Sequence, residues 1–97
     1  MPGKFTDAQI MEKLAGLPEW SLEDDSIKRK FTLTSFPAAL VFVNTVGHLA
    51  EAADHHPDIL VQWKHVTLTL STHSAGGLTA KDFDLARQID SLPMKSA

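Results

Sequence analysis

Residues 59–72, which read ILVQWKHVTLTLST, decide the fold that the sequence predicts. Within this stretch Val66, Leu68 and Leu70 alternate with hydroxyl-bearing residues, and such alternation is typical of a strand with one buried and one polar face. An apolar run precedes this strand, and only the short break at residues 62–64 separates the two. The stretch therefore predicts a β-hairpin.

A long helix is predicted immediately before this hairpin. Ser35, Phe36 and Pro37 are typical of a helix start, because proline is favoured in the first turn. Pro57 disfavours the α region for the residue before it, so the helix is expected to end near Asp54. Apolar residues cover most of its circumference, and such a helix is usually buried on more than one side. Part of its surface is therefore expected to meet another subunit.

Two further strands and two further helices complete the predicted fold. A short strand at Trp20–Glu23 and a half-buried strand at Ile27–Thr34 form a first hairpin, joined by turn-forming residues. A first helix is expected at about Thr6–Ala15, and Thr79 caps a last helix. The order helix, two strands, helix, two strands, helix predicts an α+β fold. We expect a four-stranded antiparallel sheet with the helices packed on one face.

Length and composition agree with one globular domain over residues 1–97. Of the 97 residues 43% are hydrophobic and 22% are charged, which is ordinary usage. The net charge of −3 disfavours direct binding to nucleic acid, whose affinity comes from Lys and Arg. The absence of cysteine excludes disulfides and thiolate zinc sites. No signal peptide or membrane-length apolar run is visible, so no membrane contact and a cytoplasmic location are expected.

Histidines are the residues that point to chemistry. His55 and His56 stand together between Asp54 and Pro57 at the predicted helix end, and His73 follows the alternating strand. Histidine has a pKa of about 6.5 in model peptides, so it can donate or accept a proton near neutral pH. Two histidines at a helix end and a third at a strand end could place an acid and a base around one small substrate.

Other interpretations of single residues stay open. Glu51 would share a helix face with His55 and could orient its imidazole or contact a ligand, although the spacing alone favours a solvated pair at the helix end. His48, Glu51 and His55 could together bind a metal. The usual zinc-enzyme motif is absent, however, and we expect no metal. Trp63 is either a ring that stacks on a substrate or, as its residue type favours, part of the core.

The histidines belong to a longer pattern of carboxylates, a proline and an aromatic residue. Three, five, nine and eight residues separate its successive groups, which are Glu51, His55-His56-Pro57, Trp63, His73 and Asp82. This pattern resembles that of the pterin-4a-carbinolamine dehydratases, also known as dimerisation cofactors of a homeodomain transcription factor. The resemblance covers about residues 17–90, which is nearly the whole chain.

The resemblance implies a hydro-lyase that converts a 4a-hydroxytetrahydropterin into a quinonoid dihydropterin and water, in tetrahydropterin recycling. It implies no metal and no redox cofactor. His55, His56 and His73 would be the catalytic residues, with His55 and His73 the most important pair. The remaining residues of the pattern would contact the pterin substrate or support the site: Glu51, Pro57, Trp63 and Asp82. The family fold is the same four-stranded sheet, with dimers formed through sheets and tetramers through helices.

Two other functions remain possible from the sequence. The first is a non-catalytic partner-binding or assembly protein on the same fold, which loss of a signature histidine would have favoured. All three histidines are present. The second is a small metal-dependent hydrolase that uses the His48–Glu51–His55 face. The sequence assigns neither the acid and the base nor the pterin side chain.

Overall fold

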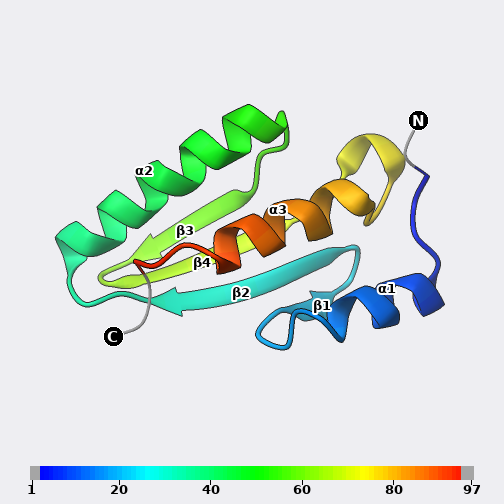
Figure 1. Ribbon diagram of the computed structural model, residues 1–97, viewed down its shortest axis with the longest axis horizontal. Helices are drawn as coiled ribbons and strands as arrows, with labels where there is room; N and C mark the ends of the chain where they lie inside the picture. The colour runs from blue at the N-terminus through cyan, green and yellow to red at the C-terminus, as the bar shows by residue number, and fades with distance from the viewer. Residues whose placement is uncertain (1–2, 95–97) are drawn as a thin grey trace.

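The computed structural model describes residues 3–94, which form three α-helices and one four-stranded sheet (Figure 1). The elements follow one another in the predicted order: α1 (Asp7–Leu14), β1 (Ser21–Glu23), β2 (Ser26–Thr32), α2 (Phe36–Ala53), β3 (Asp58–Gln62), β4 (His65–Leu70), a 3₁₀ turn (His73–Ala75) and α3 (Ala80–Asp90). The predicted α+β fold is therefore confirmed. The 3₁₀ turn was not predicted, and it takes up His73 just beyond the end of β4.

The sheet is antiparallel throughout, with strand order β1-β2-β4-β3. The two predicted hairpins meet where β2 pairs with β4, and Phe31 lies opposite Val66 in this central pair. Leu60 lies opposite Thr67 in the pair of β3 with β4. Because β1 and β3 are the outer strands, each leaves one edge of the sheet without a partner strand in the described chain.

The core lies between the sheet and helices α2 and α3, which cross the same face (Figure 1). Val66, Leu68 and Leu70 of β4 are fully buried there, as their alternation predicted. The Phe31 ring of β2 packs on Phe42 of α2 with ring centroids 4.9 Å apart. The other face carries the polar residues of the same strands and has no covering helix among the described elements.

Helix α2 buries one stripe and exposes another. Ala39, Phe42 and Val46 face the core, whereas Leu40 and Val41 are about half exposed.

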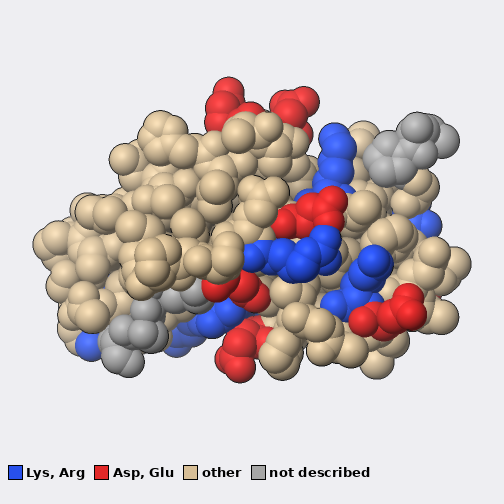
Figure 2. All heavy atoms as spheres, in the orientation of Figure 1, with Lys and Arg blue, Asp and Glu red and all other residues tan. Residues whose placement is uncertain are grey.

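Helix α2 is also the most apolar helix of the described chain by the membrane-span test, with a mean hydropathy of 1.2 over its 18 residues. Its length and composition alone would allow a membrane span, but a single helix of this kind is weak evidence for one. Figure 2 shows that charged side chains gather over α3 and the β1 side, while the left of the view, over the first turns of α2, is almost free of them.

Truncation of the core should show how much the helix–sheet contact contributes to stability. We expect Phe42→Ala to lower the free energy of unfolding by about 3–5 kcal/mol, because it removes a fully buried ring and leaves a cavity. Met11→Ala on the exposed side of α1 is the control and should change it by less than about 0.5 kcal/mol. Urea denaturation followed by circular dichroism measures both. Similar effects of the two substitutions would contradict the core placement.

Candidate functional site

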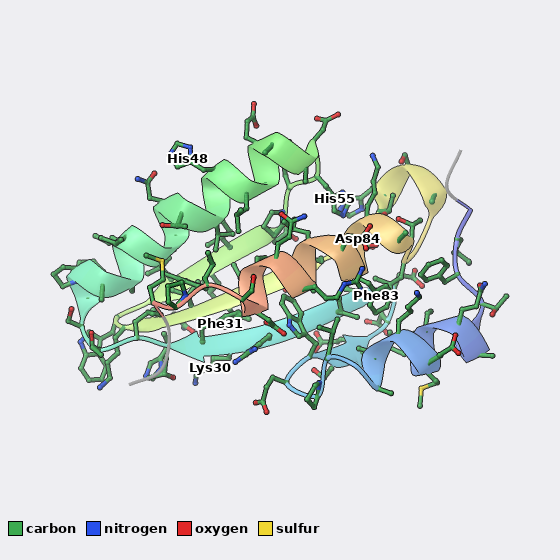
Figure 3. All side chains as sticks on the ribbon, in the orientation of Figure 1. Lys30, Phe31, His48, His55, Phe83 and Asp84 are labelled. Atoms are coloured by element: carbon green, nitrogen blue, oxygen red, sulfur yellow. The ribbon has the colours of Figure 1, made fainter. Side chains whose placement is uncertain are left out.

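The end of helix α2 places His55 against the start of helix α3. Asp54, the C-cap residue, has φ 51° and ψ 44°, a left-handed conformation that turns the chain away from the helix axis. His55 follows it and is buried, and its Nε2 lies 2.6 Å from Asp82 Oδ1. In Figure 3 His55 lies near the first turn of α3, while His48 lies on the outer side of α2.

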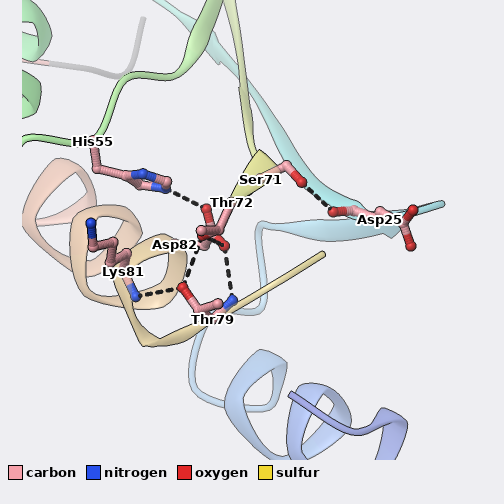
Figure 4. A network of polar contacts seen from close by, with 7 residues as sticks. All are labelled: Asp25, His55, Ser71, Thr72, Thr79, Lys81 and Asp82. Carbon is pink, nitrogen blue, oxygen red and sulfur yellow. Dashed lines mark hydrogen bonds and ion pairs between the residues drawn. The ribbon is translucent and has the colours of Figure 1, made fainter. Parts of the chain in front are cut away.

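Asp82 is the centre of a buried network of hydrogen bonds. Its Oδ2 accepts from Thr72 Oγ1 at 2.8 Å and from the backbone N–H of Thr79 at 3.0 Å. The hydroxyls of Thr72 and Thr79 are also 2.8 Å apart. Because the Thr72 hydrogen is directed at Asp82, Thr79 must donate to Thr72. Figure 4 shows how β4, α3 and the end of α2 converge on this carboxylate.

The network also fixes the tautomer of His55. An ionised carboxylate can only accept hydrogen bonds, so the Nε2 of His55 must carry the hydrogen that Asp82 accepts. The other ring nitrogen, Nδ1, is then the one available to a substrate. A histidine held in this way can take up a proton at Nδ1 while Asp82 stabilises the resulting positive charge.

The other two histidines are exposed. His56 Nε2 lies 2.9 Å from Glu51 Oε1, and both side chains are largely in solvent. Of the interpretations that the sequence left open for Glu51, the one in which it orients His55 does not hold, because Glu51 contacts His56. Helix α2 ends at Ala53, so His55 does not continue the helical face of Glu51. His73 opens the 3₁₀ turn and has an exposed side chain.

All three histidines line one open hollow of about 260 Å³. The sequence had not pointed to Lys81, Ser71 or Ser74, which also line it. A second and much smaller hollow of about 30 Å³ borders the first, and His56 and His73 line both. The histidines therefore surround a space open to a small molecule.

The proposed metal-binding face does not form. His48 points away from His55, and Glu51 contacts His56 instead. Within residues 3–94 no group of three potential ligands is close enough to hold a metal ion.

The remaining pattern residues lie at very different distances from the hollow. Asp82 contacts His55 directly, and Pro57 connects the histidine pair to β3. Trp63 occupies the turn between β3 and β4, at the far end of β3 from the histidines, about 17 Å away by strand length. Its side chain is 65% exposed, so its assignment to the core is wrong. The structure does not bring Trp63 to the histidines of its own chain.

Comparison with known proteins identifies the family of the chain. The family model described as pterin 4 alpha carbinolamine dehydratase matches residues 3–92. A protein of Roseiflexus castenholzii is 54% identical over 92 residues, which are 95% of this chain and 99% of that one. A protein of Nocardia farcinica is 55% identical over 88 residues, covering 91% and 93%. Both carry the provisional name pterin-4-alpha-carbinolamine dehydratase.

Solved structures extend the comparison. A transcriptional coactivator/pterin dehydratase from Brucella melitensis superposes with a TM-score of 0.88 at 32% identity, covering 92% of this chain and 97% of that one. A pterin dehydratase-like RuBisCO assembly factor of the alpha-carboxysome has a TM-score of 0.61 at 19% identity, covering 74% and 83%, and shows likeness of fold alone. Because the family model and relatives about half identical to it span nearly its whole length, the chain belongs to the pterin 4 alpha carbinolamine dehydratase family.

Proposed function

We propose that the protein removes water from 4a-hydroxytetrahydropterins by histidine acid–base catalysis, as a cytoplasmic step of tetrahydropterin recycling. The observation that carries this proposal is the hollow lined by His55, His56 and His73, with His55 held by the buried Asp82. Membership of the family supports the substrate class.

The reaction needs one proton delivered and one removed. The 4a-hydroxyl leaves as water once an acid protonates it, and a base takes the N5 proton as the C4a–N5 double bond forms. No electrons enter or leave, so histidines can supply the whole requirement. Each such proton transfer typically contributes about 10²–10⁴-fold to the rate.

The geometry suits different histidines to the two roles. His55 directs its N–H at Asp82, which leaves Nδ1 free to accept a proton, so we assign it as the base. His56 and His73 are exposed and border the same hollow. This position suits the acid, which delivers a proton to the hydroxyl and then takes up a new proton from solvent. Of these two we assign His73 as the acid, because His56 already contacts Glu51.

We also propose that the protein is a homo-oligomer, with no metal or redox cofactor. The exposed apolar stripe of α2 includes Phe36, Leu40 and Val41, each about half exposed. All three belong to the first turns of α2, and Figure 2 shows few charged side chains over that end of the helix. A second copy packed on the stripe would remove this apolar surface from water.

Removal of the two histidines assigned as base and acid tests the enzyme proposal. We expect the wild-type protein to accelerate dehydration of 4a-hydroxytetrahydropterin and the folded variant His55→Ala, His73→Ala to approach the rate in buffer. His48→Ala is the matched control, since this histidine lies on the outer side of α2, and it should keep the wild-type rate. Stopped-flow absorbance measures all three. If the wild-type protein gives no acceleration, the chain is not this enzyme, and a partner-binding role on the same fold takes its place.

Removal of the Thr72 hydroxyl tests the role of the buried network. Thr72→Val deletes one donor to Asp82 and leaves the Thr79 hydroxyl without its acceptor, so the free energy of unfolding should fall by about 1–3 kcal/mol. We also expect a lower kcat with little change in KM, because His55 is held less firmly.

Thr72→Ser keeps the hydroxyl and should restore both values. Nitrogen-15 NMR of the His55 ring separates orientation from stability, because it reports the tautomer directly. An unchanged single tautomer in Thr72→Val, together with a wild-type kcat, would contradict the role of Thr72 in positioning His55.

Introduction of a charge on the apolar stripe tests the assembly proposal. Leu40→Glu should shift the protein towards smaller species, because it places a charge in an apolar contact. Met11→Glu changes an even more exposed apolar residue on α1 and should leave the assembly intact. Size-exclusion chromatography with light scattering measures the mass of each. A wild-type protein that is monomeric at micromolar concentration would contradict the proposal.

A further inference from the structure

The ring of His73 has no contact of its own that fixes its position. Within residues 3–94 no hydrogen bond or ion pair reaches its imidazole. His55 differs, because Asp82 holds its ring directly. The place of the His73 ring is therefore set by the backbone of the 3₁₀ turn, His73–Ala75, that carries it. Whatever holds this turn decides where the proposed acid lies.

The turn closes on its own backbone. Thr72 and Gly77 form an antiparallel bridge, in which the Thr72 N–H donates to Gly77 O at 3.0 Å and the Gly77 N–H donates to Thr72 O at 3.3 Å. Inside the bridge the N–H of Ala75 donates to Thr72 O, and that of Gly76 to His73 O, each at 3.0 Å. These bonds give the turn its shape, so its orientation depends on what holds Thr72 and Gly77.

The Thr72 end is held by the buried Asp82 network, and the other end is held by the first residues of the described chain. The N–H of Phe5 donates to Leu78 O at 2.7 Å. The Phe5 ring also stacks on buried Phe83 of α3, with ring centroids 5.8 Å apart. Figure 1 shows this N-terminal segment, in blue, running beside the yellow turn. We call residues 4–6 the strap.

The side chain of Lys4 extends the strap over the turn. A methyl group added to the Cα of Gly77 would lie 2.7 Å from Lys4 Cδ and 3.0 Å from Lys4 Cγ, closer than unbonded carbon atoms approach. Glycine at this position therefore leaves room for the lysine stem. The strap is anchored at its other end, where Thr6 and Gln9 form a capping box at the start of α1.

The strap does not reach the histidines themselves. Neither Lys4 nor Phe5 is among the residues that line the hollow of about 260 Å³. They line a separate hollow of about 80 Å³, together with Gly77 and Leu78. Any effect of the strap on a molecule bound among the histidines must therefore pass through the turn.

We propose that Lys4 and Phe5 are positioning residues, which hold the turn so that His73 meets the 4a-hydroxyl of the substrate. A misplacement of about 1 Å can lower a catalytic rate about a hundredfold, even when the altered residue is far from the chemistry. This inference rests on the proposed function, since His73 is the acid assigned there.

Substitution of Phe5 tests the strap by its effect on the rate. Phe5→Ala should lower kcat about ten- to a hundredfold with a much smaller change in KM, because His73 acts on the leaving hydroxyl. Phe5→Leu keeps an apolar side chain against Phe83 and should stay within a few-fold of the wild type. Rates are measured by stopped-flow absorbance at a temperature at which circular dichroism shows every variant folded. A wild-type kcat in Phe5→Ala would overturn the inference.

Leu14→Ala separates positioning from stability. Leu14 is also partly buried against the core, but it lies at the other end of α1 from the strap. Its truncation should lower the midpoint of urea denaturation, as Phe5→Ala does, and leave kcat at the wild-type value. An equal loss of kcat in the two variants would mean that stability alone accounts for the effect, which overturns the inference.

A pair of substitutions tests the contact of Lys4 with the turn. Gly77 has no positive φ, so alanine fits its backbone, and Gly77→Ala should lower kcat by displacing the lysine stem. Adding Lys4→Ala makes room for the new methyl group and should restore most of the rate. Gly16→Ala is the matched control, because its methyl group would meet Lys13 O at an ordinary 3.6 Å. A wild-type kcat in Gly77→Ala, or no recovery in the double variant, would overturn the role of Lys4.

Amide hydrogen exchange examines the turn without any assay of activity. In Phe5→Ala the amides of Ala75, Gly76 and Gly77 should exchange faster than in the wild type, whereas those of β4 should keep their rates. Unchanged exchange in the turn would overturn the inference. Faster exchange without any dehydration by the wild-type protein would remove the proposed function and keep the strap. An active wild-type enzyme whose kcat survives Phe5→Ala would keep the function and remove the inference.

Discussion

The carboxylate of Asp82 is the group on which the rest of the site depends. It is buried and accepts three hydrogen bonds, one each from His55, Thr72 and the backbone of Thr79. A buried carboxylate without such partners would be strongly unfavourable, so the three donors and the helix start must form together. The Asp82 side chain thereby caps α3, fixes Thr72 just after β4 and orients His55 just after α2.

Much of the fold could be predicted because its signals are local. The alternation in β4, the proline in the first turn of α2 and the Thr79 cap each act within a few residues, and each is confirmed. Asp82 lies in the first turn of α3, close to this cap. Its contact with His55 spans 27 residues of sequence and has no local signal. The family pattern placed both residues together without giving the bond between them.

The errors in the site also have physical causes. Helical spacing suggested a pair of Glu51 with His55, but the left-handed Asp54 ends the helix before that spacing applies. Glu51 contacts His56 instead. Trp63 was assigned to the core from its residue type, yet the hairpin turn that exposes it depends on where β3 and β4 stop pairing. In both cases a single backbone conformation decided the position of a side chain.

The double role of Asp82 divides the histidines into two groups with different evolutionary freedom. His55 is bound to a carboxylate that also supports the fold, so substitutions around it weaken folding and chemistry at once. His56 and His73 are exposed and contribute little to the fold, so their substitution would lower the free energy of unfolding only slightly. A lineage released from selection for catalysis would therefore lose the outer histidines first and retain a well-folded scaffold, available for another task.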